Sequence, residues 1–187
     1  MNKPPRKSHK PRPVTRERLQ KSTLAYLERY ASSSENLRRV LMRRVAASAR
    51  LHGTDADEAA GWVDELIARY LEAGLLDDRA FAEARVRSLR GRGESARLIR
   101  ARLAQKGVAA DDVAAALHTI DEDEGDGEDA EWTAALTLAR RRRLGPFRAE
   151  DKRAKNRERD LAALARAGFS YDLARRLIEA EPEDLDD

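Results

Sequence analysis

The sequence of 187 residues contains no cysteine, and this absence excludes several kinds of site. Disulfide bridges, thiolate metal ligands and a cysteine nucleophile all require that residue. The histidines His9, His52 and His118 stand apart, without the spacing of metal ligands. There is no nucleophile elbow, and Gly91-Arg92-Gly93 lacks the remaining positions of a phosphate-binding loop. We therefore expect a binding protein that needs no cofactor or metal, rather than an enzyme.

Long apolar runs and aromatic side chains are also scarce. No apolar run approaches the ~20 residues that cross a bilayer, and the basic N-terminus lacks the apolar core of a secretion signal, so we expect a cytoplasmic protein without membrane contact. Aromatic residues make up 5% of the chain and charged residues 38%, which favours thin helical layers over a thick globule. Alternation with a period of two is hard to find, whereas good helix formers dominate. The predicted fold class is all-α.

The charges are segregated along the chain, although the net charge is only +3. Basic residues collect in the N-terminal segment, in the central helices and from Arg140 to Lys155. Acidic residues collect from Asp121 to Asp129 and from Glu179 to the end of the sequence. Segregation of this kind indicates an anionic partner along one face.

The stretch from Gly74 to Gly107 carries the strongest local pattern. Gly74 can end a helix in the left-handed conformation, and Leu75 and Leu76 lead into the next helix. Either Asp77 or Asp78 can cap that helix. Capping explains this acidic pair better than metal binding does. Phe81 starts an apolar stripe at helical spacing. The residues that we assign to a structural signature are Gly74, Leu75, Leu76, Asp77, Asp78, Phe81, Gly107, Gly168 and Phe169.

An internal repeat is visible between Leu103–Leu117 and Leu164–Ile178. Each segment has a leucine, a glycine stop, an apolar residue, an acidic first turn and a final apolar pair. We predict three tandem three-helix repeats, and in the first repeat we expect Ser32 and Glu35 to form a capping box. The predicted boundaries are a disordered basic tail at 1–16, repeats at 17–73, 74–120 and 131–181, an acidic linker at 121–130 and an acidic tail at 182–187. The basic tail is either a nucleic-acid-binding arm or a solubilising segment.

Arginines are the candidate binding residues. Glu94 is the sole acid from Arg85 to Lys106, and no acid occurs from Arg140 to Arg148. Arginine makes planar, bidentate contacts with phosphate or carboxylate, although charged helix faces are more often simply solvated. The candidates are Arg85, Arg87, Arg90, Arg92, Arg97, Arg100, Arg102, Arg140, Arg141, Arg142 and Arg143.

Three segments carry a family resemblance: GLLDDRAFA, LAQKGVAADDV and GFSYDLARRLI. In this order, over roughly Thr23 to Ala180, they resemble the RecX regulatory proteins, which modulate the bacterial recombinase RecA. The resemblance implies an elongated, curved array of three repeats that acts as a monomer. It also implies binding to RecA filaments on single-stranded DNA, contact with double-stranded DNA, and inhibition of ATPase, strand-exchange and co-protease activity in DNA repair and the SOS response.

Two alternatives stay open at this point. The first is a DNA-binding helical-repeat protein that never contacts the recombinase. The second is a nuclease or another enzyme with an unrecognised site.

Overall fold

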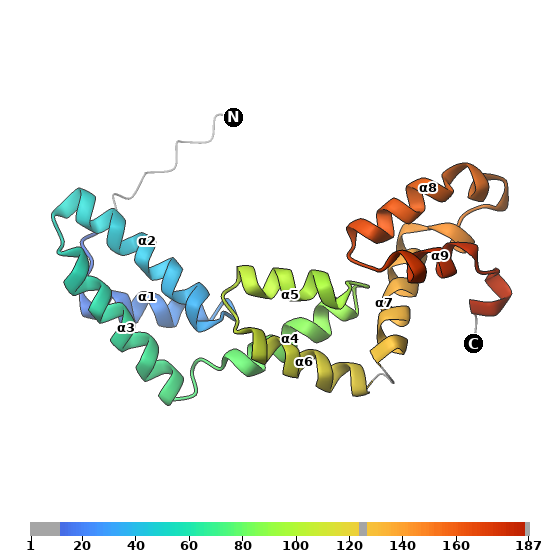
Figure 1. The fold of residues 1–187 in the computed structure, drawn as a ribbon. Coiled ribbons are helices and arrows are strands. Elements are labelled where there is room, and N and C mark those ends of the chain that lie inside the picture. The colour runs from blue at the N-terminus through green and yellow to red at the C-terminus, as the bar shows by residue number, and fades with distance from the viewer. Residues whose placement is uncertain (1–11, 124–126, 186–187) are drawn as a thin grey trace, which may run out of the picture. The chain divides into compact units, whose positions relative to one another are not determined.

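The structure is a computed structural model that describes residues 12–123 and 127–185, and every regular element within these ranges is a helix. The all-α prediction is therefore confirmed. The chain divides into two compact units, Met1–Asp77 and Asp78–Asp187. The first unit contains one three-helix repeat, and the second contains two (Figure 1).

The first unit consists of α1 (Arg16–Leu27), α2 (Ser34–His52) and α3 (Ala56–Glu72). Both α1 and α2 pack against α3. Apolar residues at helical spacing on α2 and α3 form the core, and Leu76 after α3 is buried in the same cluster. Leu75 differs from its neighbour, since 55% of it is exposed. Only one of the two signature leucines therefore contributes to this core.

The start of α2 differs by one residue from the predicted capping box. Ser33, not Ser32, is the N-cap, and its hydroxyl accepts a hydrogen bond from the Asn36 N–H at 3.2 Å. Ser32 is buried one position earlier, where its hydroxyl accepts from Asn36 Nδ2 at 2.8 Å. Successive serines are equivalent in a capping pattern, so packing decides which one takes the cap.

The described part of the N-terminal segment is attached to the first unit. The Val14 N–H donates to Ser48 Oγ at 2.9 Å, and Val14 packs against the core. Thr15 caps α1 by accepting from the Arg18 N–H. The structure thus places residues 13–16 on the folded unit, whereas the predicted basic tail extended to residue 16. Residues 1–11 lie outside the described part.

The second unit contains two repeats. The first is α4 (Asp78–Arg90), α5 (Ala96–Gln105) and α6 (Ala110–Asp123). The second is α7 (Gly127–Arg142), α8 (Glu150–Arg166) and α9 (Tyr171–Glu179), with 3-10 turns at Gly145–Phe147 and Pro182–Leu185. Each repeat has its own apolar cluster. Phe81 packs against the first of these clusters and is only partly buried, while Phe169 is buried in the second.

Parts of the stretches predicted as acidic linker and acidic tail are helical or buried. Helix α6 continues through Asp123 and α7 begins at Gly127, so both enter the stretch assigned to the linker. Leu185 in the predicted tail is buried in the core of the last repeat. Asp121 is held by a cation from another helix, as shown below, and local charge density does not reveal such a partner. Residues 124–126 and 186–187 lie outside the described part.

Candidate nucleic-acid and partner interface

All but one of the predicted arginines are exposed. Arg85 and Arg87 lie on α4, Arg92 lies in the turn before α5, and Arg100 lies on α5. None of these four side chains forms an ion pair or hydrogen bond within residues 12–123 and 127–185. Their guanidinium groups are therefore available to an external anion.

Arg90 is the exception, because it is 3% exposed. Its Nε and Nη2 atoms donate to the two carboxylate oxygens of Asp121 at 2.9 and 2.8 Å, and its Nη1 donates to Glu131 Oε1 at 2.8 Å. Burial alone would lower the pKa of the Arg90 guanidinium, but its hydrogen bonds to both carboxylates and their charges raise it. Arg90 therefore stays charged inside the protein, where it joins α4, α6 and α7 and is not available to a ligand.

Other predicted arginines have partners but keep exposed surface. Arg102 Nε lies 2.8 Å from a Glu94 carboxylate oxygen, and Arg97 Nη2 donates to the Ala165 carbonyl at 3.3 Å. Arg140 donates to the Leu185 carbonyl at 2.7 Å. Arg141, Arg142 and Arg143 lie exposed at the end of α7, without an ion pair in the described part of the chain. Three of the predicted arginines thus serve local structure as well.

The structure adds basic residues of α8 that were not among the candidates from the sequence. Lys152, Lys155, Arg159 and Arg166 lie on α8 at spacings of three, four and seven residues, which places them along one face of the helix. All four are exposed, and no described acid pairs with any of them. We call this set the α8 stripe. The helical spacing of these residues is visible in the sequence. The acidic residues that alternate with them along α8 made the segment look balanced in charge.

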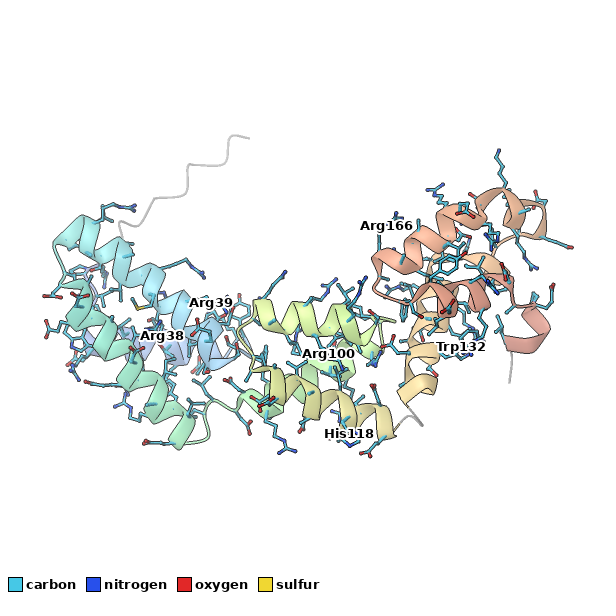
Figure 2. All side chains as sticks on the ribbon, in the orientation of Figure 1. Arg38, Arg39, Arg100, His118, Trp132 and Arg166 are labelled. Atoms are coloured by element: carbon cyan, nitrogen blue, oxygen red, sulfur yellow. The ribbon has the colours of Figure 1, made fainter. Side chains whose placement is uncertain are left out.

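Hydrogen bonds between side chains and backbone join the start of α5 to α7 and to the residue that follows α8. Ser95 Oγ caps α5 by accepting from the Leu98 N–H, and it donates to the Ala167 carbonyl at 2.7 Å. Glu131 Oε1 also accepts from the Ala96 N–H at 2.6 Å. Figure 2 labels Arg100 on α5 and Arg166 at the end of α8. The α8 stripe and the arginines of α5 therefore belong to one folded unit.

The joint between these repeats depends on close backbone packing. Gly93 has a φ of +75°, and a Cβ at this position would lie 2.6 Å from both the Ala134 carbonyl oxygen and the Leu138 nitrogen. At Gly168, where φ is +98°, a Cβ would lie 2.1 Å from Ser95 Oγ. Glycine is required at both positions for conformation and for space. The predicted signature residue Gly168 thus acts between repeats as well as at the end of α8.

A second buried ion pair fixes the loop after α7. Asp160 is 1% exposed and accepts from Arg148 at 3.0 and 2.6 Å and from the Gly145 N–H at 2.9 Å. The hydrogen bond with Asp160 raises the pKa of Arg148. This pair holds the segment that follows the arginine run Arg140–Arg143.

The two tryptophans pack against helices and cations. Trp62 and Trp132 are partly buried. The Arg176 guanidinium lies 4.2 Å from the Trp132 ring centre, and Arg16 lies 5.5 Å from that of Trp62. Each ring therefore already has a cation–π partner within its own unit.

The remaining candidates from the sequence are the histidines and the acidic pair before α4. Within the described ranges, no group of three or more His, Asp or Glu side chains is placed to hold a metal ion. The acidic pair Asp77-Asp78 lies at the start of α4. Among the described helices, none combines the length and the apolar character of a membrane span.

The fold and the site together define a class: a tandem three-helix-repeat protein whose candidate site is a basic surface. A family model described as "RecX, second three-helix domain" matches residues 77–117, which correspond to α4, α5 and most of α6.

Relatives extend this match over most of the chain. The "Regulatory protein RecX" of Myxococcus xanthus (strain DK1622) is 43% identical over 178 residues, covering 92% of this chain and 90% of the relative. The proteins of the same name from Thermobifida fusca (strain YX) and Agrobacterium fabrum (strain C58 / ATCC 33970) are 37% and 30% identical, over 82% and 89% of this chain and 80% and 84% of their own lengths. The chain belongs to the RecX family of regulatory proteins.

A solved structure shares the fold. The crystal structure of RecX from Lactobacillus salivarius matches with a TM-score of 0.56, covering 88% of this chain and 94% of that chain. The sequences are 19% identical, so this likeness concerns the fold. It agrees with the tandem three-helix organisation described above.

Proposed function

We propose that this protein regulates the RecA recombinase by binding RecA filaments on single-stranded DNA. Bound there, it restrains ATP hydrolysis, strand exchange and co-protease activity. The observation that carries the proposal is membership of the RecX family, combined with a set of exposed arginines that have no acidic partner in the described part of the chain. The proposed activity requires no catalytic residue.

The proposed DNA-contacting surface lies on the second unit. It comprises the arginines of α4 and α5, the α8 stripe and the run Arg140–Arg143, but not Arg90. The predicted candidates that stay in the proposal are Arg85, Arg87, Arg92, Arg97, Arg100, Arg102, Arg140, Arg141, Arg142 and Arg143. Neutralising phosphates with such groups releases counterions, so we expect binding to weaken with salt. Charges on this surface can also meet carboxylates of the recombinase.

The direct test is the ATPase rate of RecA on single-stranded DNA, measured with and without this protein. We expect a concentration-dependent fall in the rate. Binding to bare DNA with no effect on RecA, and no binding to its filaments, would instead favour a DNA-binding repeat protein that acts without the recombinase.

Charge removal on α5 and α8 tests the surface itself. Arg100→Gln combined with Arg166→Gln should reduce the slope of log K against log salt for single-stranded DNA by about 1.4, from roughly 0.7 per lost contact. Arg79→Gln with Arg175→Gln is the matched control, because these exposed arginines are already paired with Glu83 and Glu179. Equal slopes for the two double variants would remove α5 and α8 from the DNA surface. A loss of RecA inhibition with an unchanged slope would assign the two arginines to protein contact.

A further inference from the structure

A groove on the first unit has an apolar floor and a basic rim. Its volume is about 520 Å³, and it lies between α1 and α2. Val14, Leu19, Val40 and Ala47 supply aliphatic surface. Among the described residues, none that lines the groove is acidic. It is thus an apolar site surrounded by charge of one sign.

Four arginines form the rim: Arg12, Arg18, Arg43 and Arg44. All four are exposed. Arg18 donates one hydrogen bond to the Pro13 carbonyl at 2.9 Å, and its other N–H groups remain available to a ligand. Arg43 and Arg44 have no ion pair in the part of the chain that the structure describes. The arginine fork matches a carboxylate in bidentate geometry.

The apolar face of α2 continues beyond the groove. Leu51 follows Val40 and Ala47 at intervals of seven and four residues, so the three share one helical face. Leu51 is 52% exposed. A line of aliphatic side chains flanked by cations is complementary to an amphipathic segment with aliphatic anchors and acidic flanks.

The composition of the groove discriminates among possible occupants. Single-stranded nucleic acid binds through stacking of bases on aromatic rings, and the described residues that line this groove include none. The chain's own residues 1–11 carry Lys3, Arg6, Lys7 and Lys10 and no acid, so their charge has the same sign as the rim. Both considerations favour an acidic protein segment from another molecule.

We propose that the groove between α1 and α2 binds an acidic, amphipathic peptide segment of a partner protein, with aliphatic side chains on Val40 and Ala47 and carboxylates on Arg43 and Arg44. This site belongs to the first unit, whereas the proposed DNA surface belongs to the second. Peptide binding in this groove requires neither DNA nor RecA, so its test is independent of the proposed function.

Three labelled peptides of about 15 residues, long enough to form a helix, test the groove by fluorescence anisotropy with the full chain. They share leucines at i, i+3, i+4 and i+7 and carry Glu, Gln or Lys at the other positions. We expect binding of the Glu peptide at least tenfold tighter than that of the Gln peptide, and no binding of the Lys peptide. Equal binding of the Glu and Gln peptides, or no binding of the Glu peptide, would overturn the proposal.

Variants locate the binding. Arg43→Glu with Arg44→Glu should weaken the Glu peptide at least tenfold. Arg29→Glu with Arg50→Glu makes the same charge change on exposed residues outside the groove and should change affinity less than twofold. Val40→Asn should weaken binding at least threefold without changing its salt dependence. Circular dichroism checks that each variant remains helical.

Two further outcomes would assign the groove to another occupant and thereby overturn the proposal. The first is displacement of the Glu peptide by a thymidine oligonucleotide, with both ligands lost in the Arg43→Glu, Arg44→Glu variant. The second is a wild-type dimer in sedimentation that the same variant dissociates.

Discussion

Arg90 was predicted from the sequence as a binding residue, but the structure gives it a different role. Its neighbours along the chain suggest a free cation, yet it is buried and bridges Asp121 and Glu131. Buried charges are tolerated when they are paired and hydrogen-bonded. Removing one member of such a group leaves the others uncompensated, and that loss exceeds the net contribution of the intact pair.

Arg90→Met should therefore destabilise the second unit by about 3–5 kcal/mol. The measurement is urea unfolding followed by the emission of Trp132, in a Trp62→Phe background that leaves one reporter in that unit. A Trp132 transition unchanged by Arg90→Met would show that the network contributes no stability.

A double-mutant cycle separates the pairing from the loss of packing. Arg90→Met with Asp121→Asn should cost less than the sum of the two single changes, because the double variant leaves a smaller uncompensated charge. Additive costs would mean that Arg90 and Asp121 do not interact.

Removing the hydroxyl of Tyr70 should not destabilise the protein, in contrast to the loss of Arg90. Its side chain is buried, and its hydroxyl has no hydrogen-bond partner among the described residues. Tyr70→Phe removes this polar group and should leave the stability of the first unit equal or higher by about 1 kcal/mol. Unfolding followed by Trp62 in a Trp132→Phe background measures the change, and a clear loss of stability would reveal a hydrogen bond to water.

Tyr70 also predicts a dependence on pH. Burial raises the pKa of the Tyr70 phenol. When folding raises the pKa of a group, the stability linked to its protonation is fully present below the unfolded pKa, which is near 10 for tyrosine. That stability is lost as pH rises from there through the folded pKa. Wild type should thus lose more stability above about pH 10 than Tyr70→Phe does.

At the scale of elements, the turn between α4 and α5 is determined by packing on α7. Gly93→Ala should cost about 2–5 kcal/mol, from about 1–2 for the left-handed conformation and about 1–3 for overpacking against the α7 backbone. Gly53→Ala is the matched control, since Gly53 has a φ of +68° but nothing within 4 Å of the added Cβ. It should cost only about 1–2 kcal/mol. Equal losses, each measured with the tryptophan of its own unit, would show that contact with α7 does not matter.

At the scale of the whole molecule, the division into two units predicts independent folding. The two cores of the second unit draw only on residues after Asp78, and the core of the first unit ends with Leu76. A fragment comprising residues 78–187 should therefore keep its helical circular dichroism and a cooperative Trp132 transition. A fragment without such a transition would show that the first unit is needed for folding of the second.

The elongated array predicted from the sequence stays a prediction. Small-angle scattering of a chain that begins at Arg12 tests it directly. A radius of gyration near 16 Å, the value expected from the size scaling of a compact chain of this length, would contradict the prediction.

The sequence by itself determined the all-α class, the tandem repeats and the RecX resemblance. These follow from local information: the apolar stripe after Phe81, the stops at Gly74 and Gly107, and the matching segments around Gly107 and Gly168. Each of these signals acts within a few turns of helix, where spacing and backbone conformation are set by near neighbours.

Only the tertiary structure decided which charges are free. The pairing of Arg90 with Asp121 and Glu131 spans 31 and 41 residues, and such pairings leave no local pattern. The same holds for the approach of Gly93 to α7 and of Ser95 to the end of α8. A surface for anions depends on which cations lack a partner, and partners are chosen when the repeats pack together. For this reason the groove of the first unit, and the lack of acidic partners along the α8 stripe, could be found only in the folded molecule.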